Sequence, residues 1–538
     1  MQNSEQDPIR RSGPSGSLRT SLSQYAPGVP WSRQTPAEID ALFARQRTAD
    51  PFGLRLHEWA AIAACVLGGF PTAAVTFAAG PLLLVFLVRM YTHHRVLGPL
   101  WWEGVVRAMV AWSAWLALSL FWSADRRLGT DEVGTMAFGL LVPALYPVLD
   151  RRPVLVRAVM LGLFCGVASQ GVHILGRRLH VDALTWHRLP GRDSGWWDPV
   201  IAGSLLCALV GLTGASLWLG RSVRERLFGA LGVVVALAAL ALTGTRGAWI
   251  GGAITLGAGA SAGLVSRLGS LRSRPHADPP SGVRAPGSGA RAWIVPFLLA
   301  VAAVSIAVWL VNRPALRQRV EAGVNDVRAA LESGNYTTDT GARIAMWEWA
   351  YAAWRCHPVV GVGAGGYRAW VHHQAQMHHM AQEPTVVGEA GAAAETAETP
   401  CPHRGPITGG GSRVHAHAHG LWPQVAATTG TIGVAIMLWL LGSAIVSGVK
   451  PQRRAAGATS EGAIDRAATQ ETALDRAGPP LALVGLAAAG LFDSISVNQQ
   501  TWYLAMVLVA LCVSRRPAPW HKPIKAREFR GVGGVPIE

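Results

Sequence analysis

Long apolar runs, separated by short basic segments, occupy most of the chain between Trp59 and Val513. A helix that crosses a bilayer needs about 20 apolar residues, and fewer where interface residues cap it, so these runs predict about twelve transmembrane helices. The pattern is therefore that of an all-α, polytopic integral membrane protein. We expect two short spans within Trp59–Met90, broken near Gly69–Pro71, and further spans at Trp101–Trp122, Val133–Leu149, Val154–Leu175, Pro199–Leu219, Leu227–Leu242, Ala248–Leu264, Ala292–Val311, Leu421–Val446, Leu481–Phe492 and Thr501–Val513.

Basic residues orient these expected spans. An even number of spans places both chain ends on one side of the membrane, and Lys and Arg collect in alternate connections and in the C-terminal tail. The positive-inside rule then predicts that both ends are cytoplasmic. One short outside turn, which contains Arg126 and Arg127, goes against this assignment.

Composition agrees with a membrane protein. Charged residues make up 15% of the chain, against about 25% in average soluble proteins. The 22 tryptophans suit a protein with two membrane–water interfaces. The net charge of +16 lies mostly in short segments between apolar runs, which favours membrane topology over binding to nucleic acid.

The expected topology divides the chain into five segments. Residues 1–56 are polar and form a disordered cytoplasmic tail. Residues 57–311 hold helices one to nine, 312–419 form a large outside loop, 420–514 hold helices ten to twelve, and 515–538 form a second cytoplasmic tail. The large loop begins with short helices, and its part from about Gln382 to Ser412, rich in Ala, Gly, Glu and Thr, is expected to be a mobile insertion.

Arg246 is the strongest single candidate for a functional residue. It lies in the turn Thr243–Gly247 between two apolar runs, and ionisable residues at membrane depth mark functional sites by default. The alternative is an arginine that reaches out to lipid headgroups. The neighbouring Gly244 and Gly247, which let the backbone approach a ligand closely, favour the functional interpretation.

Further arginines lie in the outside segments, where the topology rule does not require positive charge. Arg188 and Arg192 belong to the connection 176–198, and Arg343 begins a predicted helix of the large loop, on the same face as Trp347. The planar guanidinium group matches phosphate oxygens, so this set predicts an anionic ligand. Contact with lipid phosphates, or for Arg343 a surface salt bridge, is the alternative.

Histidines at a spacing of two precede the apolar run that begins at Leu421. His415, His417 and His419 cannot share one helix face, so we expect an extended segment at the membrane surface that places a proton-transfer group there. A polar loop end is the alternative. No carboxylate or cysteine is spaced to complete a zinc site with these histidines, so we expect no metal and no cofactor.

The cysteines point to one conditional disulfide. Cys356 and Cys401 share the large loop and could pair if that loop lies outside the cytoplasm. The other four lie in apolar runs and are expected to be small buried hydrophobes.

Five stretches, in this order along the chain, resemble the O-antigen ligase/polymerase family of polytopic membrane glycosyltransferases. They are Leu120–Asp125, Trp197–Pro199 with Ala202, Thr243–Ala248, Arg343–Trp354 with the following Gly361–Tyr367, and His419–Gln424 with Thr429–Gly433. Three positions depart from the family pattern, because Val200 and Gly420 replace an expected Asn and Thr428 replaces an expected Glu. His419 fits the family spacing to Gln424 best, and His417 is the second candidate for the catalytic histidine.

The resemblance implies a reaction and its location. The donor would be a glycan on undecaprenyl pyrophosphate at the periplasmic face of the bacterial inner membrane, and the acceptor a hydroxyl of lipid A–core, another glycan or a protein, as in lipopolysaccharide or other polysaccharide biosynthesis. It implies a metal-independent reaction with His419 or His417 as base and with Arg246, Arg343 and Arg188 or Arg192 on the pyrophosphate.

Rival interpretations of the chain remain open. Within the family, they are a repeat-unit polymerase and a protein O-oligosaccharyltransferase. A transporter of lipid-linked glycans is the rival from another class, although transporters more often show internal repeats, and none is visible in this sequence.

Overall fold

The computed structural model describes residues 48–93, 100–101, 103–186, 192–272, 314–380, 417–449 and 472–513. Within these ranges the chain is helical and forms no strand, in agreement with the predicted all-α class. The expected span Ala292–Val311, the expected insertion Gln382–Ser412 and the candidate residue Arg188 lie outside the described residues.

Seven helical segments of the described ranges are long and apolar enough to cross a membrane. They are Thr72–Tyr91, Gly104–Trp122, Arg126–Arg178, Pro199–Leu219, Val223–Leu242, Arg246–Gly269 and Leu421–Val449. Helix α18 (Gln499–Cys512) is apolar but shorter, and helices α2 (Pro51–Leu67) and α17 (Ala473–Ala489) have 17 residues each. The structure thus supports a multi-pass membrane protein, while the count of twelve spans stays a prediction.

The first half of the chain follows the predicted runs with one difference. Helices α2 and α3 (Thr72–His93) are separated at residues 68–71, as predicted, and α4 (Gly104–Ser119) continues into η3 (Leu120–Trp122). The expected single helix Val133–Leu149 is instead divided among short pieces: α5 (Arg126–Thr135), η4 (Met136–Leu140), α6 (Leu141–Leu145) and η5 (Tyr146–Arg151). Proline contributes to this division, because Pro143 and Pro147 lack the N–H group that a regular helix needs.

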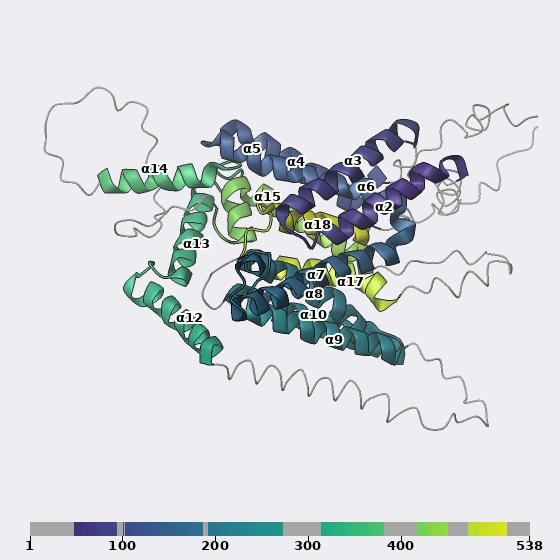
Figure 1. Ribbon diagram of the computed structural model, residues 1–538. Coiled ribbons are helices and arrows are strands. Elements are labelled where there is room, and N and C mark those ends of the chain that lie inside the picture. The colour runs from purple at the N-terminus through teal and green to yellow at the C-terminus, as the bar shows by residue number, and fades with distance from the viewer. Residues whose placement is uncertain are drawn as a thin grey trace, which may run out of the picture.

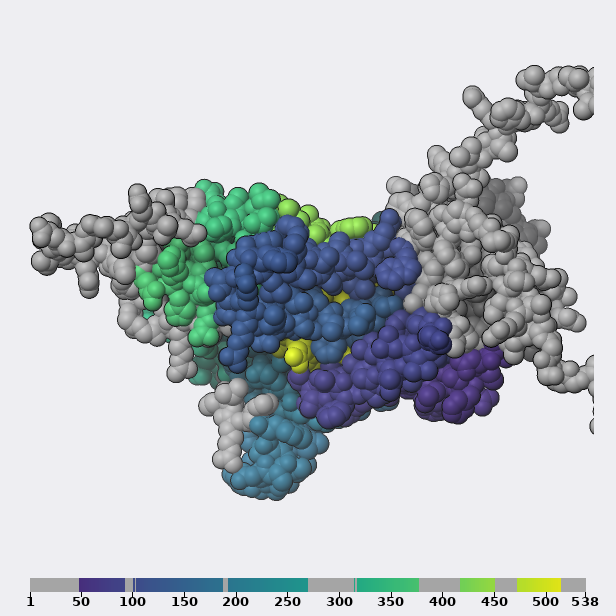
Figure 2. All heavy atoms as spheres, turned by 90° about the horizontal axis from the view of Figure 1, so that it is seen from above, coloured from purple at the N-terminus to yellow at the C-terminus, as the bar shows by residue number. Residues whose placement is uncertain are grey.

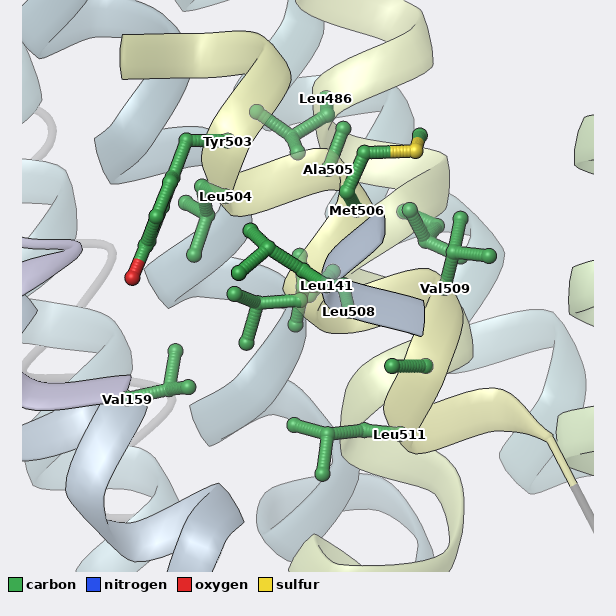
Figure 3. Close-up of a cluster of buried hydrophobic side chains, with 14 of the residues drawn as sticks. Leu141, Val159, Leu486, Tyr503, Leu504, Ala505, Met506, Leu508, Val509 and Leu511 are labelled. Atoms are coloured by element: carbon green, nitrogen blue, oxygen red, sulfur yellow. The ribbon is translucent and has the colours of Figure 1, made fainter. Parts of the chain in front are cut away.

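Close helix contacts build the bundle. After α7 (Arg152–Arg178), helix α8 (Pro199–Leu219) is buried along most of its length, beside α9 (Val223–Leu242), α10 (Arg246–Arg272) and α17. Glycines make this possible, since a Cβ at Gly211 would overlap the backbone of Leu481 and one at Gly485 would overlap that of Cys207. Figure 3 shows α18 at the centre, where Tyr503, Met506 and other side chains of its length lie near Leu141, Val159 and Leu486.

Three helices lie together at one end of the bundle. They are α12 (Pro314–Ser333), α13 (Asp339–Cys356) and α14 (Gly366–Met380), drawn in green in Figures 1 and 2. None of them is among the seven membrane-crossing candidates. The Thr338 side chain caps α13 by accepting a hydrogen bond from the Gly341 N–H at 3.1 Å. Cys356 at its end is disulfide-bonded, and Cys401, the expected partner, lies outside the described residues.

Helix α15 (Leu421–Val449) is broken at Gly430, where φ is 66°. The turn 358–366 docks against this break: the Val362 N–H donates to the Ala427 carbonyl oxygen and the Gly363 N–H to that of Thr428, both at 2.8 Å. These bonds satisfy carbonyl groups that the broken helix leaves without partners. A Cβ at Gly430 would overlap the Val359 carbonyl oxygen, so the approach of the turn requires glycine there.

Candidate active site at one end of the bundle

Arg246 begins α10 and is held by the helices that cover it. Its Nη1 donates to Asp326 Oδ2 at 3.1 Å and to Thr340 Oγ1 at 2.8 Å, and the Thr340 hydroxyl donates to the same Asp326 oxygen at 3.1 Å. Gly323 of α12 leaves room for the arginine, because a Cβ there would come within 3.1 Å of Arg246 Cδ. These contacts bind Arg246 to α12 and α13, and 30% of its side chain stays exposed.

Other arginines gather around Arg246. Arg192 Nη2 lies 3.5 Å from Asp339 Oδ2. The Arg319 Nη1 donates to the Gly244 carbonyl oxygen at 3.2 Å, in the turn that carries Arg246. Burial lowers the pKa of Arg319, and the positive charges of Arg192 and Arg246 lower it further. Arg319 was not among the predicted site residues, because in the sequence it looks like an ordinary basic residue of an amphipathic helix.

Arg343 belongs to the same cluster, and its guanidinium N–H groups are available to a ligand. It is half-buried on α13, and among the described residues it forms no hydrogen bond and no ion pair within 4.0 Å. Burial lowers the pKa of Arg343, the charge of Asp493 raises it, and Arg192 and Arg246 lower it again. A guanidinium group in this position, among other cations, favours an anionic ligand.

Asp493 is a buried carboxylate that was not among the predicted site residues. It lies in the connection between α17 and α18, is 8% exposed, and accepts a hydrogen bond from the Ser204 hydroxyl of α8 at 3.1 Å. Burial raises the pKa of the Asp493 carboxyl, while the Ser204 hydroxyl and the charge of Arg343 oppose that rise. A carboxylate that directly follows an apolar run was the available signal.

The segment 417–420 places two histidines beside each other. The ring centroids of His417 and His419 are 4.2 Å apart. His419 has a φ of 45°, in the left-handed region that side-chain-bearing residues rarely adopt. Such backbone strain persists where the surroundings impose it, and it clusters at functional sites.

Neighbouring elements hold this segment by its backbone. The Ala418 N–H donates to Gln424 Oε1 at 2.8 Å, the Trp347 indole N–H to the His419 carbonyl oxygen at 3.4 Å, and the Gly420 N–H to Ser494 Oγ at 3.1 Å. The three contacts come from α15, from α13 and from the connection before α18. Together they hold the backbone that carries the two histidine rings.

Helix α13 joins the arginine and histidine groups. Arg343 and Trp347 are one helical turn apart and so lie on one face. Trp347 contacts the histidine segment, and its ring centroid lies 5.8 Å from that of Phe492. The connection 492–494 runs along the same face, since Asp493 interacts electrostatically with Arg343 and Ser494 bonds Gly420.

The structure thus brings together five of the residues predicted from sequence: Arg192, Arg246, Arg343, His417 and His419. Within the described ranges, no group of three or more His, Cys, Asp or Glu side chains is placed to hold a metal ion. The roles of the five residues stay predictions.

Fold and site together define a multi-pass helical membrane protein that gathers arginines and a histidine pair at one end of its bundle. Residues 231–438, which include Arg246, Arg343, His417 and His419, match the family model described as O-antigen ligase. This match supports the resemblance to the O-antigen ligase/polymerase family that the sequence motifs predicted. An uncharacterized protein of Haemophilus influenzae (strain ATCC 51907 / DSM 11121 / KW20 / Rd) is similar, with 25% identity over 164 residues, which cover 30% of this chain and 35% of that protein. The chain therefore aligns with about a third of that relative's length.

Proposed function

We propose that the protein is a membrane glycosyltransferase of the O-antigen ligase type. It moves a glycan from undecaprenyl pyrophosphate to an acceptor hydroxyl at the periplasmic face of the inner membrane. The observation that carries this proposal is the position of Arg343, which lacks an ion-pair partner among the described residues and lies on the helix face that also contacts the histidine segment. In this proposal, an anion bound by Arg343 lies near a histidine that can act as a base.

The arginines bind the pyrophosphate and stabilise the leaving group. The acceptor oxygen attacks the anomeric carbon of the donor glycan, and the bond from that carbon to the pyrophosphate oxygen breaks. The electron pair stays on the departing pyrophosphate, where Arg246 and Arg343, helped by Arg192, stabilise the developing charge. Fixed cations lower a barrier in this way because they need no reorganisation during the reaction. Arg188 keeps its predicted role as an alternative to Arg192.

His419 takes the proton of the acceptor hydroxyl, and His417 is the second candidate for this base. A neutral imidazole is a suitable general base near pH 7. In this scheme the guanidinium groups supply the positive charge at the leaving group, so the reaction is metal-independent and needs no cofactor.

The proposal includes the membrane arrangement. Twelve spans, two cytoplasmic tails and a periplasmic segment 312–419 place the arginines and histidines on the outer side, where the lipid-linked donor is presented. Helices α12 and α13 cover the donor pyrophosphate from that side. The acceptor, whether lipid A–core, another glycan or a protein, approaches from the periplasm.

Arginine variants test the site directly. In a strain that lacks the chromosomal gene, Arg246→Ala and Arg343→Ala are each expected to lower glycan transfer about 100-fold, the usual loss when one donor to a developing anion is removed. Arg178→Ala, at an exposed arginine of α7, is the matched control and keeps full transfer. Membrane levels are measured by immunoblot and transfer by gel analysis of glycolipids. An Arg246→Ala protein at normal level with full transfer contradicts the proposed role of the arginines.

Deletion of the gene separates the ligase from its rivals. Loss of all polymer from the lipid A–core band, with polymer accumulating on the carrier lipid, is the expected ligase result. Single repeat units still attached to the core mean a polymerase. An unchanged lipopolysaccharide pattern contradicts the ligase and leaves a protein or exopolysaccharide acceptor, or transport.

A further inference from the structure

Glu132 of α5 is a buried carboxylate that touches two segments far from it in the chain. It is 8% exposed. The Gly365 N–H, in the turn 358–366, donates to its Oε2 at 3.0 Å, and Gln424 Nε2 of α15 donates to its Oε1 at 3.3 Å. The carboxylate therefore bridges the docked turn and the start of α15.

Gln424 extends this bridge to the histidine segment. It is 2% exposed, and its Oε1 accepts the hydrogen bond from the Ala418 N–H at 2.8 Å. A backbone N–H can only donate, so the amide oxygen must face Ala418 and the amide nitrogen must face Glu132. Glu132 then has to accept at both of its oxygens, which a carboxylate does and an amide does not. The donor and acceptor roles of all four groups are thereby fixed.

We propose that Glu132 is a positioning residue that couples the docked turn 358–366 to the two candidate catalytic histidines. It acts through Gln424 on Ala418, the residue between His417 and His419. When Gly365 is in place and bonded to Glu132, the carboxylate is oriented to hold Gln424, and Gln424 holds the histidine segment. The inference rests on the proposed function only for its effect on transfer, because the coupling itself is a statement about backbone contacts.

Substitutions at Glu132 and Gln424 have different consequences, which can be separated by experiment. Glu132→Gln presents one acceptor and one donor, so either the Gly365 bond or the Ala418 bond must be lost. Glu132→Ala loses the contact to Gly365 and frees Gln424. Gln424→Ala removes the hydrogen bond to the Ala418 N–H but leaves the bond between Gly365 and Glu132 intact. The exchanged pair Glu132→Gln with Gln424→Glu restores every bond. The new amide at position 132 then accepts from Gly365 and donates to the new carboxylate at position 424, which also accepts from Ala418.

Amide hydrogen exchange on the full chain in detergent micelles measures these bonds individually. In the wild-type protein we expect slow exchange at the amides of residues 365 and 418. Glu132→Ala should speed exchange at both, Gln424→Ala at 418 only, and the exchanged pair should return both to within about twofold of the wild-type rate. Asn498→Ala, which removes the cap of α18, is the control and should leave both amides slow.

The same variants connect the bridge to transfer. Misplacement of a reacting group by about 1 Å costs on the order of 100-fold, so Glu132→Gln is expected to lower kcat by about 10- to 100-fold with little change in KM for the acceptor. The exchanged pair should recover most of kcat. Unchanged exchange at residue 418 in Glu132→Ala, or failure of the exchanged pair to restore slow exchange, overturns the coupling. Exchange as expected with kcat unchanged overturns the proposed role of the histidines in transfer and leaves the bridge as structure alone.

Discussion

At the scale of single residues, the site holds ionisable groups in places where burial disfavours their charged forms. Burial raises the pKa of Asp493 and lowers that of Arg343, and each group's charge opposes the shift of the other. Structural ion pairs also show such shifts, but here Arg343 forms no close pair among the described residues. Perturbed groups of this kind cluster at functional sites, which makes Asp493 and Arg343 candidates for a chemical role.

Asp493→Asn should separate stability from transfer. The folded-state pKa of Asp493 lies above its ordinary value of 3.8, so the folded protein binds this proton more tightly than the unfolded chain does. The energetic cost of ionisation is then absent well below pH 3.8, grows as the pH rises through that value, and is complete above the folded-state pKa. The variant cannot ionise, so it should be more stable than the wild-type protein at neutral pH, with the difference shrinking on acidification.

Thermal unfolding in detergent at a series of pH values measures this difference, and the same preparations give transfer activity. Transfer by Asp493→Asn should fall, because Arg343 loses the charge that faces it. Asp131→Asn, at an exposed aspartate of α5, should change neither quantity. Equal stability of the Asp493 variant and the wild-type protein at neutral pH would contradict the assignment of a buried, costly carboxylate.

At the scale of elements, the break in α15 makes the docking of the turn 358–366 possible. Gly430 interrupts the helix, and the turn supplies the N–H groups that its carbonyl oxygens need. The same turn carries Gly365, whose N–H reaches Glu132. The glycines of this turn are thus explained by close backbone contacts.

Gly430→Ala is expected to destabilise the protein. An alanine at a φ of 66° costs about 1–3 kcal/mol, and its Cβ would also overlap the Val359 carbonyl oxygen. The matched control is Gly442→Ala on the same helix, where a Cβ meets nothing within 4 Å and the change should stay within about 1 kcal/mol. Thermal unfolding measures both, and amide exchange at residues 362 and 363 should accelerate in the first variant alone. Equal melting temperatures for the two variants would be incompatible with this role of Gly430.

Element positions were largely predictable from the sequence, whereas partners across the fold were not. Hydrophobic runs of span length locate α3, α4 and α8 to α10 because the bilayer sets their length and composition. The division of the expected helix Val133–Leu149 depends on packing and on prolines that the hydropathy pattern does not weigh. Asp326, Asp493 and Glu132 meet partners 80, 289 and 292 residues away, and no local pattern encodes such contacts.

At the scale of the whole molecule, the site draws on connections that all reach one end of the bundle. Arg192 precedes α8, Arg246 follows α9, the histidine segment precedes α15, and Asp493 follows α17. Helices α12 and α13 lie at that end in Figure 1. Helix α12 contacts Arg246 through Asp326, and α13 contacts the histidine segment through Trp347. A bundle of antiparallel helices brings alternate connections together in this way, so residues far apart in sequence meet at one end.

Labelling on either side of the expected span Ala292–Val311 can test on which side of the membrane this end of the bundle lies. Ser266, near the end of α10, and Ser333, at the end of α12, are both exposed and lie on either side of that span in sequence. If the span crosses the membrane, the two positions are on opposite sides. A cysteine at 333 should then react with a membrane-impermeant maleimide in intact spheroplasts, and a cysteine at 266 only after the membrane is permeabilised.

Native cysteines give this labelling a low background, since Cys65, Cys207 and Cys512 are buried and Cys356 is disulfide-bonded. The wild-type protein is the control for Cys165, which is half-buried. Labelling of both positions from outside would mean that Ala292–Val311 does not cross the membrane and that α10 has the reverse orientation. The number of spans would then be odd, and the prediction of a cytoplasmic C-terminus would lose its basis. Labelling of 266 alone would invert the whole assignment and put Arg246 and His419 on the cytoplasmic side, where no periplasmic acceptor could reach them. Labelling of 333 from outside and of 266 only after permeabilisation keeps the arginines and histidines on the side that the proposed function requires.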